Sequence, residues 1–249
     1  MSYFNFENNN IFYKECGKGD PLILIHGDSA SSRMFMPELK FYSKNFRTII
    51  VDLIGQGKSQ RVTKLPLDYW NANGKMIAAL CRHIGINKVN MIGTSGGAIV
   101  ALNAVIHAPE LFNKVIADSF IGEKLTLEFA EQTIKERENS KKKISSKIFW
   151  FMMHGHDWRY VVDQNTLLIS EFSKEIGSFF HKDISSIKNE VLITGSRKDD
   201  LIPDIENILK GINSKIENSK LVIFERGNHP AMLSNIKEFR NIVLDFFNK

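Results

Sequence analysis

The sequence has few cysteines, no long apolar run and no low-complexity tract. Cys16 and Cys81 are too few for a disulfide framework, so we expect reduced thiols. The longest apolar candidate, 148–153, is far shorter than the roughly 20 residues that span a bilayer. The first residues lack the basic and apolar regions of a secretory signal. These absences predict a cytoplasmic protein without a membrane span.

A strong excess of one charge is also missing. The 33 basic and 28 acidic residues give a net charge of +5, which is mild for 249 residues. The one basic run, 141–143, has no interleaved aromatic residues and no nucleic-acid-binding motif beside it. We therefore interpret it as a solvated helix face and expect no nucleic-acid partner. The length suffices for one large domain, with or without an insertion.

Apolar runs alternate with helix-length segments along most of the chain. A continuous apolar run is typical of a strand that helices cover on both faces of a parallel sheet. The expected strands are 22–25, 48–51, 89–92, 115–117, 191–193 and 221–224, and the expected helices between and after them are 33–44, 68–85, 96–108, 203–212 and 235–248. Residues 3–16 predict an antiparallel hairpin that turns at Asn8, Asn9 and Asn10. This order predicts an α/β fold with a mostly parallel, doubly wound sheet.

One interval, 121–185, contains no clear parallel strand. It holds helical stretches such as 125–138 and 161–180 and is rich in Phe, Trp and Met. We interpret it as a helical cap insertion, which leaves 1–120 and 186–249 as the core domain. Aromatic and Met side chains supply adaptable apolar surface, so we expect the cap to cover the carboxyl end of the sheet and to shape an apolar pocket.

The sequence Gly93-Thr94-Ser95-Gly96-Gly97 fits the pattern G-x-S-x-G between a predicted strand and a predicted helix. In that context the pattern indicates a nucleophile elbow, a sharp turn that exposes the serine hydroxyl. Its glycines allow the strand and the helix to approach closely. A serine that only caps the helix is the alternative. The pentapeptide alone does not separate the two interpretations.

Polar segments also follow the other predicted strands, at the edge where open α/β sheets bind ligands. They are His26-Gly27-Asp28, 52–59, 195–203 and Gly227-Asn228-His229-Pro230. Together with the elbow, these segments resemble the α/β-hydrolase superfamily over essentially the whole chain, in the branch with a helical cap after the sixth strand. The resemblance implies a serine hydrolase that needs no cofactor and no metal.

A serine is a poor nucleophile until a base takes its proton, and an imidazole with a pKa near about 6.5 suits that task. A carboxylate then fixes the imidazole tautomer. Ser95, Asp199 and His229 stand in the family order of serine, acid and histidine. Asp199 precedes Pro203 by the family's frequent spacing. Asp200 and Asp118 remain alternative acids.

The resemblance places the oxyanion hole at the backbone N–H groups of Asp28 and Gly96. Asp28 departs from the family, which more often has an aromatic or small residue at this position, and its carboxylate would lie near a developing negative charge. We expect His26 to brace this loop through hydrogen bonds. The segment 154–157 contains two histidines and an aspartate, but no further ligands stand at metal-binding spacing, so we predict no metal.

These residues predict an esterase acting on a small-molecule acyl substrate with a small or medium acyl group, through an acyl-enzyme. Thioesters, lactones, amides and N-terminal peptides remain open, as does cofactor-free perhydrolase or haloperoxidase chemistry. The elbow serine argues against the dehalogenase and epoxide hydrolase branches, which use an aspartate there. A ligand receptor on the same fold is the rival from another class. The oligomeric state stays open.

Overall fold

Eight strands form one sheet in the computed structural model, which describes residues 2–248 and so leaves out Met1 and Lys249 at the ends of the predicted core ranges. The sheet order is β1-β2-β4-β3-β5-β6-β7-β8. The strands are β1 (Ser2–Phe6), β2 (Asn9–Cys16), β3 (Pro21–Ile25), β4 (Arg47–Val51), β5 (Val89–Thr94), β6 (Phe112–Asp118), β7 (Glu190–Ser196) and β8 (Ser219–Phe224). Along this order the pairs β1–β2 and β2–β4 are antiparallel, and every neighbouring pair after β4 is parallel. The predicted α/β fold is therefore confirmed.

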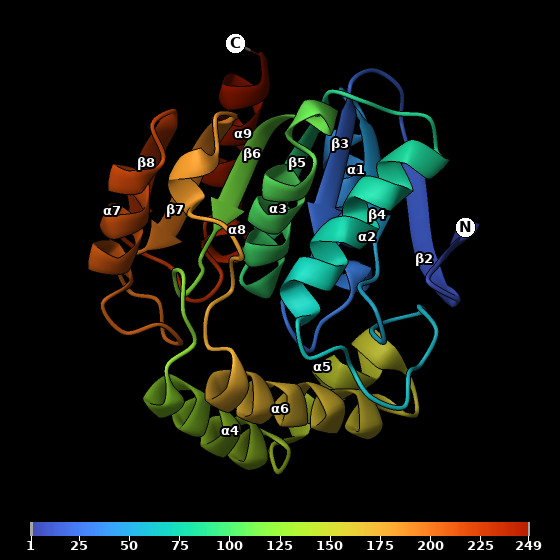
Figure 1. Ribbon diagram of the computed structural model, residues 1–249, viewed down its shortest axis with the longest axis vertical. Coiled ribbons are helices and arrows are strands. Elements are labelled where there is room, and N and C mark those ends of the chain that lie inside the picture. The colour runs from blue at the N-terminus through green and yellow to red at the C-terminus, as the bar shows by residue number, and fades with distance from the viewer. Residues whose placement is uncertain (1, 249) are drawn as a thin grey trace.

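Helices cover both faces of this sheet, which explains the continuous apolar strands. On one face lie α2 (Tyr69–His83), α3 (Gly96–His107) and α7 (Ile205–Lys215), and on the other lie α1 (Met36–Tyr42) and α9 (Ile236–Asn248) (Figure 1). Along β3, Ile23 packs with the first group and Leu24 with the second. All five predicted helices are present, with ends shifted by a few residues.

The predicted antiparallel hairpin is present, but of its three predicted turn residues only Asn8 lies in the turn. The turn residues are Glu7 and Asn8, whereas Asn9 and Asn10 already belong to β2 and pair with Phe6 and Asn5. Glu7 and Asn8 both have positive φ, 48° and 63°. A two-residue turn with positive φ at both positions matches the twist of the flanking strands, and asparagine tolerates that backbone well.

Three α-helices stand between β6 and β7 in the chain and lie beyond the carboxyl ends of the strands (Figure 1). They are α4 (Leu127–Ser140), α5 (Ile144–His154) and α6 (Trp158–Glu175). The remaining short helices are η1 (Ser32–Phe35), η2 (Pro109–Leu111), η3 (Ile184–Ser186) and α8 (Ala231–Ser234). We keep the division into a core and a cap at 121–185 as a prediction. Within residues 2–248, no helix combines the length and the apolar character that a membrane crossing requires.

Candidate active site

Ser95 stands alone between the end of β5 and the start of α3, with φ 55° and ψ −127°. This strained backbone is stable because its surroundings enforce it. A Cβ atom at Gly97 would overlap the carbonyl oxygen of Ile25, and one at Gly93 would overlap the carbonyl oxygen of Gly97. The glycines therefore permit the close approach of strand and helix. The Ser95 side chain makes no capping hydrogen bond to α3, so the interpretation as a helix cap is wrong.

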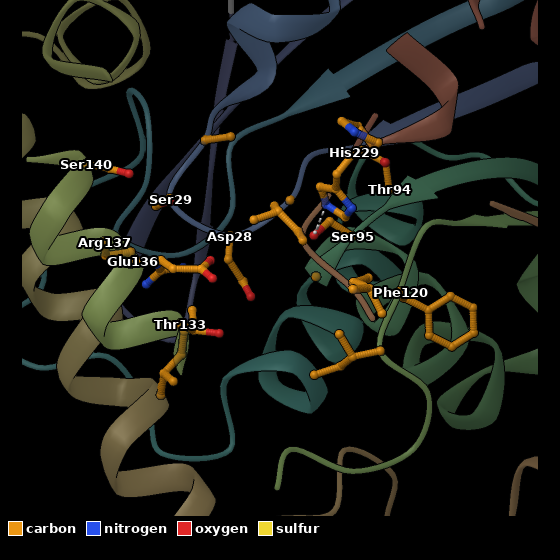
Figure 2. Close-up of a pocket in the computed structure, with 18 of the residues that line it drawn as sticks. Asp28, Ser29, Thr94, Ser95, Phe120, Thr133, Glu136, Arg137, Ser140 and His229 are labelled. Carbon is orange, nitrogen blue, oxygen red and sulfur yellow. Dashed lines mark hydrogen bonds between the residues drawn. The ribbon is translucent and has the colours of Figure 1, made fainter. Parts of the chain in front are cut away.

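A chain of hydrogen bonds joins Ser95, His229 and Asp199, which come from three separate segments. Ser95 Oγ lies 3.0 Å from His229 Nε2, and His229 Nδ1 lies 2.9 Å from Asp199 Oδ2. Figure 2 shows the first of these bonds. The other Asp199 oxygen accepts from the N–H groups of Leu201 and Ile202, each at 2.9 Å. The Asp199 carboxylate is therefore fixed, buried and directed at the imidazole.

Asp200 contacts the same histidine in a different way. Its Oδ1 accepts from the backbone N–H of His229 at 2.9 Å, whereas the ring nitrogen is taken by Asp199. Adjacent carboxylates in this loop point in different directions, as expected for neighbours in extended or turn backbone. Asp200 is therefore bonded to the His229 backbone, and Asp199 is bonded to the imidazole ring.

Asp118 is completely buried at the end of β6, and its side-chain hydrogen bonds within the described chain go to groups other than the His229 ring. Its carboxylate oxygens accept from Thr94 and Thr194 at 2.8 and 2.7 Å and from the Met232 N–H at 3.1 Å. Burial raises the pKa of Asp118, and these hydrogen bonds oppose that rise. Asp118 thus ties the ends of β5 and β7 to the segment that follows His229.

The loop after β3 packs directly against the serine. A Cβ atom at Gly27 would lie 2.9 Å from Ser95 Cβ, and one at Gly96 would meet the carboxylate of Asp28. Gly96 is the first residue of α3, so its N–H has no acceptor within the helix. The backbones of Asp28 and Gly96 therefore both lie beside Ser95. We keep their N–H groups as the proposed oxyanion hole.

Two histidines outside the hydrogen-bonded chain hold loops together. His26 donates from Nδ1 to the Gly27 carbonyl at 2.8 Å and accepts at Nε2 from the Leu53 N–H at 3.0 Å, as expected from the sequence. His154 accepts from the Gly57 N–H at 3.1 Å and donates to the Ser29 carbonyl at 3.0 Å. Burial lowers the pKa of His154 to about 4. His154 therefore attaches α5 to the strand-end loops as a neutral imidazole.

The segment 154–157 does not gather metal ligands. Asp157 forms an ion pair with Arg61 at 2.7 Å, and His156 packs its ring edge-on against Phe151. Within the described part of the chain, no three His, Cys, Asp or Glu side chains stand close enough together to hold a metal ion.

Ser95 and His229 open onto a cavity of about 630 Å³ between the strand-end loops and the helices α4 and α5. Its apolar lining includes Phe149, Trp150 and Phe179 from the interval that the sequence marked as aromatic. Phe151 and Met152, from the same interval, are instead 45% and 55% exposed. The Phe, Trp and Met residues of 121–185 are therefore divided among the cavity, the buried core, where Phe172 lies, and the outer surface.

The α4 wall of this cavity is polar, which the sequence analysis did not predict (Figure 2). It presents Gln132, Thr133, Glu136, Arg137 and Ser140. The last four follow Gln132 by one, four, five and eight positions, and residues at these spacings lie on one face of a helix. This spacing is the signal in the sequence that could have predicted a polar face. Asp28 lies between this wall and Ser95 (Figure 2).

The Asp28 carboxyl is an unusual charge to place beside a nucleophile. Burial raises its pKa from the usual 3.8 to about 6, although Arg137 and Trp70 both favour its charged form. Its Oδ1 has no hydrogen-bond partner within the described residues, and Trp70 Nε1 does not reach hydrogen-bond geometry. The ionised Asp28 carboxylate therefore destabilises the folded state.

Comparison with known proteins agrees with this fold. A family model described as the alpha/beta hydrolase fold matches residues 20–138. The chain is 25% identical over 260 residues to a 2-hydroxy-6-oxo-2,4-heptadienoate hydrolase of Pseudomonas putida, with 93% of this chain and 90% of the relative covered.

Two solved structures share the fold at 18% sequence identity. A 2-hydroxy-6-oxo-6-phenylhexa-2,4-dienoate hydrolase from a Rhodococcus species has a TM-score of 0.79, with 99% of this chain and 98% of that chain covered. An esterase from Exiguobacterium antarcticum has a TM-score of 0.77, with 97% and 96% covered. At this identity the likeness establishes the fold, and the chemistry has to be argued from the site.

Proposed function

Because the chain belongs to the α/β-hydrolase superfamily, we propose that it is a serine hydrolase that cleaves carboxylic esters of small or medium acyl groups. One observation carries the proposal: Ser95, His229 and Asp199 are hydrogen-bonded in series at 3.0 and 2.9 Å beside an open cavity. A nucleophile that contacts a base, which in turn contacts an acid, is the arrangement that activates a serine.

The reaction follows from this geometry. Ser95 Oγ attacks the ester carbonyl while His229 Nε2 takes its proton, and the Asp199 carboxylate stabilises the imidazolium that forms. The backbone N–H groups of Asp28 and Gly96 donate hydrogen bonds to the carbonyl oxygen as its negative charge develops. His229 then gives the proton to the leaving alcohol. Water, activated by the same histidine, releases the acid and restores Ser95.

The similar proteins support hydrolysis as the reaction, but their names do not agree on a single substrate. One is named an esterase, and two are named hydrolases of substituted dienoates. The ester assignment rests instead on the cavity, which offers apolar lining close to Ser95.

A panel of p-nitrophenyl esters of increasing acyl length tests the proposal. We expect repeated turnover by the wild type, with the highest kcat/KM at short or medium length, and loss of turnover in Ser95→Ala. Ser146→Ala, which alters another serine of the cavity lining, serves as the control. A stoichiometric burst without turnover would favour a ligand receptor. Equal turnover by wild type and Ser95→Ala would reject the proposal.

A further inference from the structure

Three buried polar atoms that line the cavity lack a hydrogen bond of normal geometry within the described residues. They are Nη1 of Arg137, Oδ1 of Asp28 and Nε1 of Trp70. Buried polar atoms are nearly always paired, because an unpaired one is strongly destabilising. The Trp70 indole stabilises the Asp28 carboxylate at longer range. Arg137 and Asp28 are therefore the groups whose missing partner calls for an explanation.

Arg137 and Asp28 influence each other across the cavity without touching. Burial is the largest influence on the pKa of each, but Arg137 also lowers the pKa of Asp28, and Asp28 raises the pKa of Arg137. Within the described residues no hydrogen bond or ion pair joins the two side chains, and Figure 2 shows Asp28 between Ser95 and the α4 wall that carries Arg137. The cavity thus holds a separated pair of opposite charges near Ser95.

The electrostatics of this pair select one kind of occupant. A carboxylate would suit Arg137 but would face the negative charges of Asp28 and of Glu136 on the same wall. An ammonium group would suit Asp28 but would face Arg137. An apolar group would leave both unpaired, which is unfavourable. A neutral group that accepts at one end and donates at the other satisfies both charges.

We propose that this part of the cavity is a subsite for a neutral hydrogen-bonding group on the acyl chain of the substrate, of which a carboxamide is the simplest. Its carbonyl accepts from Arg137 Nη1, and its N–H donates to Asp28 Oδ1. The inference rests on the proposed function, because it places the scissile carbonyl at Ser95. It adds a substrate class: esters whose acyl chain ends in an amide-like group.

Binding to the Ser95→Ala protein tests this subsite separately from catalysis, because that variant keeps the cavity and lacks the nucleophile. The ligands are methyl esters with three isosteric acyl ends, namely carboxamide, carboxylate and isopropyl, each with two to five methylene groups. Affinity is measured by calorimetry. Hydrogen bonds to charged groups predict that the carboxamide binds about tenfold or more tightly than the isopropyl ligand at the best length.

Substitutions at Arg137 then identify the contact. In the same background, Arg137→Met should bring the carboxamide-to-isopropyl affinity ratio close to one, whereas Arg137→Lys, which keeps a charged donor, should retain part of it. Arg159→Met removes an exposed arginine of α6 that stacks on Trp158 and should leave the ratio unchanged. Thermal unfolding of each variant checks that it is folded.

The outcomes separate this inference from the proposed function. Tightest binding by the carboxylate ligand, equal binding by the isopropyl ligand at every length, or no binding at all would overturn the subsite. An unchanged ratio in folded Arg137→Met would do the same. If the carboxamide preference holds in Ser95→Ala while the wild type hydrolyses none of the three esters, the subsite stands and the hydrolase assignment fails.

Discussion

Replacing Asp28 with asparagine should stabilise the protein, and the gain should depend on pH. In the folded protein, burial raises the pKa of this carboxyl from 3.8 to about 6. Between those values the folded state binds a proton that the unfolded state has lost, so stability falls as the pH rises through this window. At about 1.36 kcal/mol per pH unit, the ionised carboxylate lowers the free energy of unfolding by about 3 kcal/mol above pH 7.

Asparagine has nearly the same shape and carries no charge. Asp28→Asn should therefore raise the free energy of unfolding by up to about 3 kcal/mol at pH 8, and by less than about 1 kcal/mol at pH 4, where the wild-type carboxyl is protonated when folded. Urea unfolding of both proteins at the two pH values measures the difference. The exposed Asp20→Asn is the matched control and should show no such gain.

Two results would refute this reasoning. One is an Asp28→Asn protein that is no more stable than the wild type at pH 8. The other is a gain of the same size at pH 4 and pH 8, because the effect would then not come from ionisation. A gain confined to high pH would also show that the fold tolerates a destabilising charge beside Ser95, which is the usual sign of a functional position.

Further substitutions should separate the roles of the acidic residues and of the elbow. Asp199→Asn should lower kcat by up to about 10⁴-fold, as in a Ser-His-Asp protease, because the imidazole loses its correct tautomer. Asp200→Asn should lower kcat less than about tenfold, because an asparagine oxygen can still accept from the His229 backbone N–H. Asp118→Asn should lower the free energy of unfolding in urea by about 1–3 kcal/mol, because an amide nitrogen cannot accept from the donors around it. Gly97→Ala should lower the thermal unfolding temperature and abolish ester turnover, since its Cβ would overlap the Ile25 carbonyl oxygen. Near-wild-type kcat in Asp199→Asn, or wild-type stability in Asp118→Asn or Gly97→Ala, would contradict these assignments.

The parallel strands and the elbow could be predicted because their signals are local. Strands covered on both faces carry continuous apolar runs, and β3, β4, β6 and β7 each contain a run of at least three apolar residues. The position of Ser95 between a strand and a helix followed from the glycines around it. The hairpin turn was misplaced because three consecutive asparagines offer several equally suitable turn positions.

The choice between Asp199 and Asp200 could only be weighed from the sequence, because it depends on which side chain faces the ring of His229. Helix α5 escaped prediction because it is apolar on both its buried and its exposed sides, as Ile144 and Ile148 show at 75% and 55% exposure. Without an apolar stripe, helical periodicity gives little signal. Arg137 was missed because a charged residue in an amphipathic helix is normally expected to face solvent.

Covalent labelling of Ser95 tests the central claim most directly. A fluorophosphonate reacts only with a serine that a neighbouring base activates, so intact-mass measurement should show one adduct on the wild type. Peptide mapping should place that adduct on Ser95, and Ser95→Ala should remain unlabelled under the same conditions. Equal labelling of the two folded proteins, or an adduct on another residue, would contradict the assignment of Ser95 as the nucleophile.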